Sequence, residues 1–123
     1  MLDINRIYNQ DCLDGMKRID DKSIDMVLCD LPYGVTRCEW DVIIPLDKLW
    51  EQYKRIVKER GAIVLTSTQP FTTALINSNK RQYRYTWYWI KNCAVGFASS
   101  RYQPLRQVEE ILVFYKKAPT YHP

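Results

Sequence analysis

A short apolar run that ends in a rigid turn limits the folds open to this chain most strongly. Residues 24–29 read Ile-Asp-Met-Val-Leu-Cys, and Asp30-Leu31-Pro32-Tyr33-Gly34 follows directly. A short, nearly continuous apolar run is typical of a strand buried in a parallel sheet. Proline and glycine then punctuate the chain as a turn. The junction predicts an α/β protein with a site just beyond a strand's carboxyl end, where open α/β sheets form their sites.

The first half of the chain otherwise alternates between strand and helix patterns. Residues 6–10 can form a brief strand, and Asp11 is placed to cap a short helix that reaches about Arg18. Residues 46–58 repeat apolar side chains at helical spacing. Gly61 follows as the expected helix stop.

The second half begins in the same way and then changes. Residues 62–65 predict another short buried strand, and Pro70 can open a helix to about Asn77. Residues 83–90 and 108–115 are rich in aromatic and β-branched side chains, as strands are, and no helix pattern separates them. The sequence therefore predicts parallel strands followed by an antiparallel strand pair, in an α/β fold.

Composition bounds the class of protein. A chain of 123 residues, 46% hydrophobic and 26% charged, predicts one folded domain over residues 1–123. The net charge of +4 is compatible with nucleic acid binding without requiring it. No apolar run reaches membrane-spanning length, and the cysteines form neither a CxxC pair nor a Cys/His cluster. We therefore expect a reduced, cytoplasmic protein with no membrane segment and no metal.

The turn after residues 24–29 carries groups suited to an amino group on a flat ring. Asp30 can accept a hydrogen bond, the Pro32 carbonyl can accept another, and Tyr33 offers a face on which a base can stack. An exocyclic amino nitrogen of adenine or cytosine is a poor nucleophile because its lone pair is delocalised. Two acceptors would localise that lone pair and support the positive charge that develops, once the base has left the helix stack. A strand-ending turn of the same composition also occurs without such a function.

The turn and its surroundings resemble the amino-methyltransferases that carry a "DPPY" signature, here with Leu31 in the second position. They are similar to phage and prophage adenine methyltransferases in which this motif precedes the cofactor motif. The matching stretches, in chain order, are residues 9–16, 30–34, Trp40-Asp41, 61–71, 87–91, Gly96-Phe97, 104–106 and 111–115.

This resemblance implies a partial Rossmann-like class I methyltransferase sheet and methyl transfer from S-adenosylmethionine to adenine N6 in DNA. It implies that Asp30, Pro32 and Tyr33 are catalytic and that Asp11 and Asp30 lie near the cofactor. Tyr33 and Trp40 are expected to contact the nucleic acid. An aspartate at position 30, where cytosine-N4 enzymes often carry serine, favours adenine.

The chain also departs from the family pattern. Val108-Glu109 stands where relatives often have a His-Glu pair, and the four glycines are isolated, so the glycine loop for the cofactor is not found. The family fold places a further strand beside residues 24–29. An unpaired apolar edge there predicts a homodimer, a second polypeptide that completes the sheet, or a longer protein.

Other interpretations stay open. A non-catalytic descendant could use the same fold to bind DNA or a protein, and an inactive fragment of a decayed prophage gene is a third interpretation. The aromatic residues of strand 83–90 predict core packing in preference to a nucleic acid surface. The basic residues Lys48, Lys54, Arg55, Lys58 and Arg60 predict a solvated helix face in preference to a phosphate-binding patch.

Overall fold

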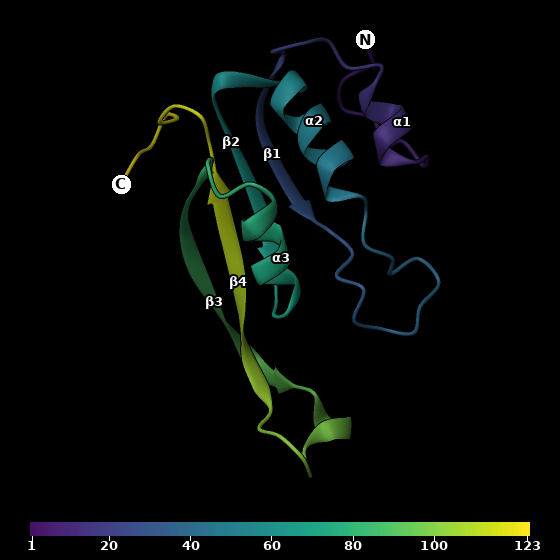
Figure 1. Ribbon diagram of the computed structural model, residues 1–123, viewed down its shortest axis with the longest axis vertical. Helices are drawn as coiled ribbons and strands as arrows, with labels where there is room; N and C mark the ends of the chain where they lie inside the picture. Colours follow the sequence, from purple (N-terminus) through teal and green to yellow (C-terminus); the bar gives the residue numbers. More distant parts are fainter.

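Four strands form one sheet, and the three α-helices lie over one of its faces (Figure 1). The computed structural model describes residues 1–123. The elements are α1 (Cys12–Met16), β1 (Ile24–Asp30), α2 (Leu46–Ile56), β2 (Val57–Ser67), α3 (Phe71–Ser78), β3 (Tyr83–Val95), a short 3-10 helix (Phe97–Ser99) and β4 (Arg106–Phe114). The spatial order of the strands is β1-β2-β4-β3.

The strand directions confirm the predicted α/β class. β1 pairs with β2 in parallel, and the connection between them carries α2. β4 lies between β2 and β3 and runs antiparallel to both. The chain therefore forms a mixed sheet that corresponds to part of a Rossmann-like sheet.

The core lies between the helices and the covered face of the sheet. The helical spacing in α2 directs Leu49, Trp50 and Tyr53 inward, where they join one buried cluster with β2 and β4. Phe114 of β4 is fully buried, and its ring centroid lies 4.8 Å from that of Trp50. Val27 and Cys29 pack against the same cluster, which fixes β1, the strand whose carboxyl end carries the turn at residues 30–34.

Several predicted boundaries are wrong. Residues 6–10 form no strand, and α1 ends at Met16, although Asp11 caps it as predicted. Gly61 does not stop a helix: α2 ends at Ile56, and Gly61 lies inside β2, which is longer than the predicted 62–65. A side chain at Gly61 would place its Cβ 2.8 Å from the Asp25 carbonyl oxygen of the neighbouring strand. Glycine is required there by close backbone approach.

The second face of the sheet has no helix over it (Figure 1). On β1, Met26 and Leu28 are 52% and 70% exposed, in alternation with residues that pack on the core. On β3, Tyr85 and Trp87 stack on one another and are both exposed. The prediction that the aromatic side chains of strand 83–90 pack in a core is therefore wrong for most of them, and holds for the half-buried Tyr83, which packs against Phe114.

The four cysteines are free. No group of three or more His, Cys, Asp or Glu side chains is arranged to hold a metal ion. None of the helices has the length and apolar character needed to cross a membrane.

Candidate functional site

The turn at residues 30–34 is anchored by one buried residue and exposes its neighbours. Leu31 is buried in the core, which explains why an apolar side chain serves in this position. Asp30, the last residue of β1, and Pro32 both line a cavity of about 280 Å³. The Pro32 carbonyl oxygen accepts no hydrogen bond from the backbone. The turn thus brings two residues with acceptor groups to one hollow.

Asp30 is held by two hydroxyl groups through one of its oxygens. Thr66 is its partner in the parallel register and donates to Asp30 Oδ1 at 2.7 Å. The Tyr33 hydroxyl lies 3.0 Å from the same oxygen and 2.8 Å from Thr66 Oγ1, so it can donate to either acceptor. Because both contacts use Oδ1, the other carboxylate oxygen is left to accept from a ligand.

Tyr33 is fixed on one side by the core. Its ring stacks on Phe71 of α3, with centroids 5.4 Å apart. Burial raises the pKa of the Tyr33 hydroxyl above its usual value, the hydrogen bond with Thr66 opposes that rise, and the Asp30 carboxylate adds to it. The hydroxyl therefore stays protonated at neutral pH and acts as a donor that positions Asp30.

Asp41 lines the same cavity and binds the backbone of the turn and of the two residues after it. Its carboxylate accepts from three successive backbone N–H groups, those of Gly34, Val35 and Thr36, at 2.7–3.0 Å. The Thr36 hydroxyl also donates to it at 2.7 Å. These hydrogen bonds, with that from the Thr36 side chain the largest cause, lower the pKa of Asp41 to about 2. An ionised, 7% exposed Asp41 thus closes the loop back onto the turn.

A second hollow of about 160 Å³ adjoins the first at Tyr33. Lys91 of β3 and Glu109 of β4 line it and form an ion pair, with Nζ and Oε1 2.5 Å apart and both side chains largely buried. Glu109 is the acid of the Val108-Glu109 pair that departs from the family's His-Glu pattern. Its carboxylate is therefore occupied by a cation close to the turn.

The structure brings most of the predicted site residues together. Asp30, Pro32, Tyr33 and Trp40 all line the 280 Å³ cavity, and Trp40 is 74% exposed at its edge. Asp11 does not line it, because its carboxylate accepts from the backbone N–H groups of Leu13 and Asp14 and caps α1. The roles expected of these five residues stay predictions.

Two residues of this site were not identified by sequence reasoning. Thr66 lies just beyond the predicted strand 62–65, and its role depends on the register that places it beside Asp30. Asp41 was singled out without a role. An acid seven residues after a glycine turn was a usable signal, because such an acid can accept from the turn's free N–H groups.

No family model matches the chain, but curated relatives do. It is 24% identical over 129 residues to the Type II methyltransferase M1.MboII of Moraxella bovis, across 96% of this chain and 48% of that protein. Over 40 residues it is 38% identical to the Type II methyltransferase M.HindIII of Haemophilus influenzae, across 32% of this chain and 13% of that protein. The chain thus spans about half the length of M1.MboII, and its match to M.HindIII covers a smaller share of that protein.

Solved structures agree with this similarity at the level of fold. PvuII DNA methyltransferase, described as cytosine-N4-specific, superposes with a TM-score of 0.71 at 13% identity, over 92% of this chain and 50% of that one. M1.HpyAVI in complex with SAM gives 0.68 at 17% identity, over 94% and 60%. A Thermus thermophilus protein described as a putative DNA modification methylase, complexed with S-adenosyl-L-methionine, gives 0.62 at 15% identity, over 92% and 56%. The chain has the methyltransferase fold and is similar in sequence to two Type II methyltransferases.

Proposed function

We propose that this chain carries the target-base site of an S-adenosylmethionine-dependent DNA amino-methyltransferase. The observation that carries the proposal is the cavity at the end of β1, where Asp30 keeps one oxygen free and the Pro32 carbonyl has no backbone donor. The similarity to Type II methyltransferases supports DNA as the substrate. A DNA substrate and the reduced cysteines also favour the cytoplasm.

The proposed chemistry uses two acceptors on one amino group. Asp30 Oδ2 and the Pro32 carbonyl accept the two amino hydrogens, so the nitrogen lone pair points away from the ring plane toward a methyl donor. Charge then develops on nitrogen beside the Asp30 carboxylate, which Thr66 and Tyr33 already hold in place. The methylated nitrogen would then lose one of its two hydrogens as a proton to solvent, which restores its neutrality. Preorganised groups of this kind need no rearrangement as the charge forms. Tyr33 and Trp40 would flank the extruded base.

S-adenosylmethionine would supply the methyl group, and these residues fit only part of its site. Asp30 would stand between the base and the cofactor, whereas the carboxylate of Asp11 already accepts from the backbone N–H groups that begin α1. The isolated glycines form no phosphate- or methionine-binding loop. We therefore assign this chain the amino-group side of the reaction, with most cofactor contacts from polypeptide beyond these residues.

We propose adenine N6 as the target, on the ground of an aspartate at position 30 and of the resemblance to phage and prophage adenine enzymes. Cytosine N4 is the second candidate, since the PvuII enzyme that shares this fold is described as cytosine-N4-specific. Both targets present an exocyclic amino group to the same two acceptors, so the cavity accommodates either reaction.

We also propose that a second copy or a second polypeptide covers the edge of β1. Met26 and Leu28 lie exposed on that terminal strand, whose outer edge pairs with no other strand. Such an edge is a template for a further strand. Sedimentation at increasing concentration tests this: self-association that Leu28→Lys weakens is the expected result, and a monodisperse monomer at all concentrations contradicts the homodimer.

Transfer of labelled methyl groups to unmethylated DNA tests the function. The chain is assayed alone and together with the part of the Moraxella bovis relative that lies beyond the matched region. DNA is then digested and its nucleosides are separated. Label in N6-methyladenine supports the proposal, label in N4-methylcytosine moves the target to cytosine, and label on a ring carbon contradicts amino transfer.

Asp30→Asn gives the matched variant, because it preserves shape and removes the charge. We expect it to lower the transfer rate at least about a hundredfold, in the range found when a preorganised electrostatic group is removed. Asp14→Asn, a surface aspartate on α1, serves as control and should leave the rate unchanged. Equal rates in the Asp30 variant and the parent would refute the assigned role.

A further inference from the structure

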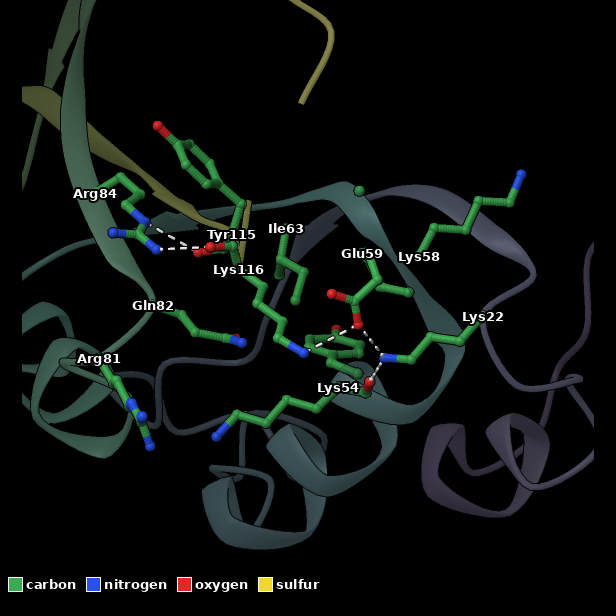
Figure 2. A pocket seen from close by; sticks show the side chains of 13 residues that line it. Lys22, Lys54, Lys58, Glu59, Ile63, Arg81, Gln82, Arg84, Tyr115 and Lys116 are labelled. Carbon is green, nitrogen blue, oxygen red and sulfur yellow. Dashed lines mark hydrogen bonds and ion pairs between the residues drawn. The ribbon is translucent and has the colours of Figure 1, made fainter. Parts of the chain in front are cut away.

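A larger cavity of about 520 Å³ lies at the opposite end of the sheet from the Asp30 turn (Figure 2). Residues next to the amino ends of β1 and β2 line it together with residues at the start of β3 and just after β4. Its charged lining consists of one acid, Glu59, and six basic side chains: Lys22, Lys54, Lys58, Arg81, Arg84 and Lys116. The basic side chains come from segments distant in sequence, which is why the sequence alone predicts only a solvated helix face.

The acids near this cavity are already committed. Glu59 Oε1 lies 3.0 Å from Lys116 Nζ and 3.9 Å from Lys22 Nζ, and its other oxygen lies 3.8 Å from Lys117. The hydrogen bond from Lys116 is the main cause that lowers the pKa of Glu59, so this acid stays ionised at neutral pH. Lys58 pairs with Asp25 outside the lining.

The remaining cations have no acidic partner. Lys54 and Arg81 form no ion pair and donate no side-chain hydrogen bond, and Arg84 donates only to the carbonyl oxygens of Tyr115 and Lys116. In Figure 2 the ends of Lys54, Arg81 and Gln82 lie on the same side of the cavity, whereas the end of Lys116 reaches the Glu59 carboxylate. Unpaired cations gathered around a hollow repel one another, and an anion placed among them removes that cost.

We propose that this cavity binds a small phosphorylated ligand with more than one phosphate group. Lysine and arginine are the side chains that bind phosphate oxygens through charge-assisted hydrogen bonds. The volume of about 520 Å³ falls within the range of roughly 300–1,000 Å³ that small-molecule sites occupy. Lys54, Arg81 and Arg84 are the three cations of the lining without an acidic partner. A polyphosphate or a nucleoside polyphosphate can offer each of them an anionic oxygen and therefore fits the charge better than a single phosphate.

This site is separate from the proposed base site. Lys22 precedes β1 and Asp30 ends it, so the seven residues of that strand put about 20 Å between the two, at roughly 3.3 Å per residue. A ligand here would not contact the reacting atoms. A concave site also suits a small ligand better than a duplex, whose convex backbone would reach only the rim.

Calorimetric titration of inorganic tripolyphosphate into the 123-residue chain at low salt tests the proposal. One site per chain is expected. Lys54→Gln combined with Arg81→Gln should weaken binding at least about tenfold, because it removes two charge-assisted contacts. Lys54→Arg combined with Arg81→Lys keeps both charges and should retain binding within about threefold, allowing for changed geometry.

A charge-matched control separates the cavity from the overall charge of the protein. Lys48→Gln combined with Arg101→Gln removes two exposed cations that do not line the cavity and form no ion pair. This variant should bind tripolyphosphate as the parent does. Because Lys54 and Arg81 have exposed side chains without partners, their variants should also unfold at the same temperature as the parent.

Three outcomes would overturn the proposal. Absence of binding would do so, and so would equal weakening in the cavity and control variants, which would indicate general charge attraction. The third is a parent that binds duplex DNA through Lys54 and Arg81 but not tripolyphosphate, because that result assigns these cations to a nucleic acid backbone. Methyl transfer is not part of the assay, so its failure would leave this inference standing.

Discussion

Removing the Thr66 hydroxyl is the sharpest perturbation of the candidate site. Thr66→Val preserves the branched shape of the side chain on β2 and deletes one oxygen. That oxygen donates to Asp30 Oδ1 at 2.7 Å and lies 2.8 Å from the Tyr33 hydroxyl. In the variant, Tyr33 can still donate to Asp30 from 3.0 Å. The carboxylate would thus lose one of its two hydroxyl donors.

The loss of this hydrogen bond sets the expected change in the free energy of unfolding. A hydrogen bond to a charged group contributes about 1.5–3 kcal/mol, and water can replace part of it here because Asp30 is exposed. We expect the free energy of unfolding to fall by about 1 kcal/mol. For a domain of this size, that corresponds to a decrease in Tm of about 4 °C.

Urea denaturation followed by tryptophan fluorescence measures this change, and a double-mutant cycle with Tyr33→Phe isolates the Thr66–Tyr33 contact. We expect a coupling energy of about 0.5–1 kcal/mol, since the two hydroxyl groups share one network. An unchanged unfolding midpoint in Thr66→Val would refute the reasoning. Full additivity of the two variants would show that the hydroxyls act independently.

Three further predictions concern the loop and the core. The pKa of Asp41 is lowered to about 2 from an ordinary 3.8. Its ionised form therefore stabilises the fold above pH 3.8, and that contribution is lost as the pH falls toward 2. Acid unfolding of Asp41→Asn should lack this part of the transition. Gly34 has a φ of 70°, and a Cβ there would lie 2.9 Å from the Ile43 side chain. Gly34→Ala should therefore lower the Tm and shift the amide signals of the loop, and an unchanged Tm would contradict this. Phe114→Ala should cost about 3–5 kcal/mol and broaden or abolish cooperative thermal unfolding, whereas a sharp transition at the parent's Tm would place Phe114 outside the core.

The sequence predicted those elements that depend on the pattern of neighbouring residues in the chain. The structure confirms α2 from its helical spacing and the cap at Asp11 from residue type. It confirms β1 as a parallel strand, but the predicted burial of that strand is wrong, because Met26 and Leu28 are exposed on the uncovered face. Gly61 misled the prediction because glycine marks both helix ends and close backbone approach, and only the neighbouring strand distinguishes them. Trp87 misled it because an aromatic strand packs in a core only where a helix covers that face.

Part of the candidate site could also be predicted from neighbouring residues in the sequence. Asp30, Pro32 and Tyr33 fall within four consecutive residues, so their proximity followed from sequence. Thr66 joins them through sheet register, and the basic cavity is assembled from four separate segments, so neither could be read from local spacing. Residues that meet only through tertiary structure leave no periodic signal.

Titration of adenosine into the isotope-labelled chain, followed by backbone amide NMR, tests the central claim most directly, because it needs neither the cofactor nor a target sequence. Inosine is the matched ligand, since it carries a carbonyl oxygen where adenosine carries the amino group. Our account predicts shifts at residues 30–41 with adenosine, much weaker shifts with inosine, and their loss in Asp30→Asn. Equal responses to the two nucleosides, or shifts confined to other parts of the chain, would contradict an amino-group site at the end of β1.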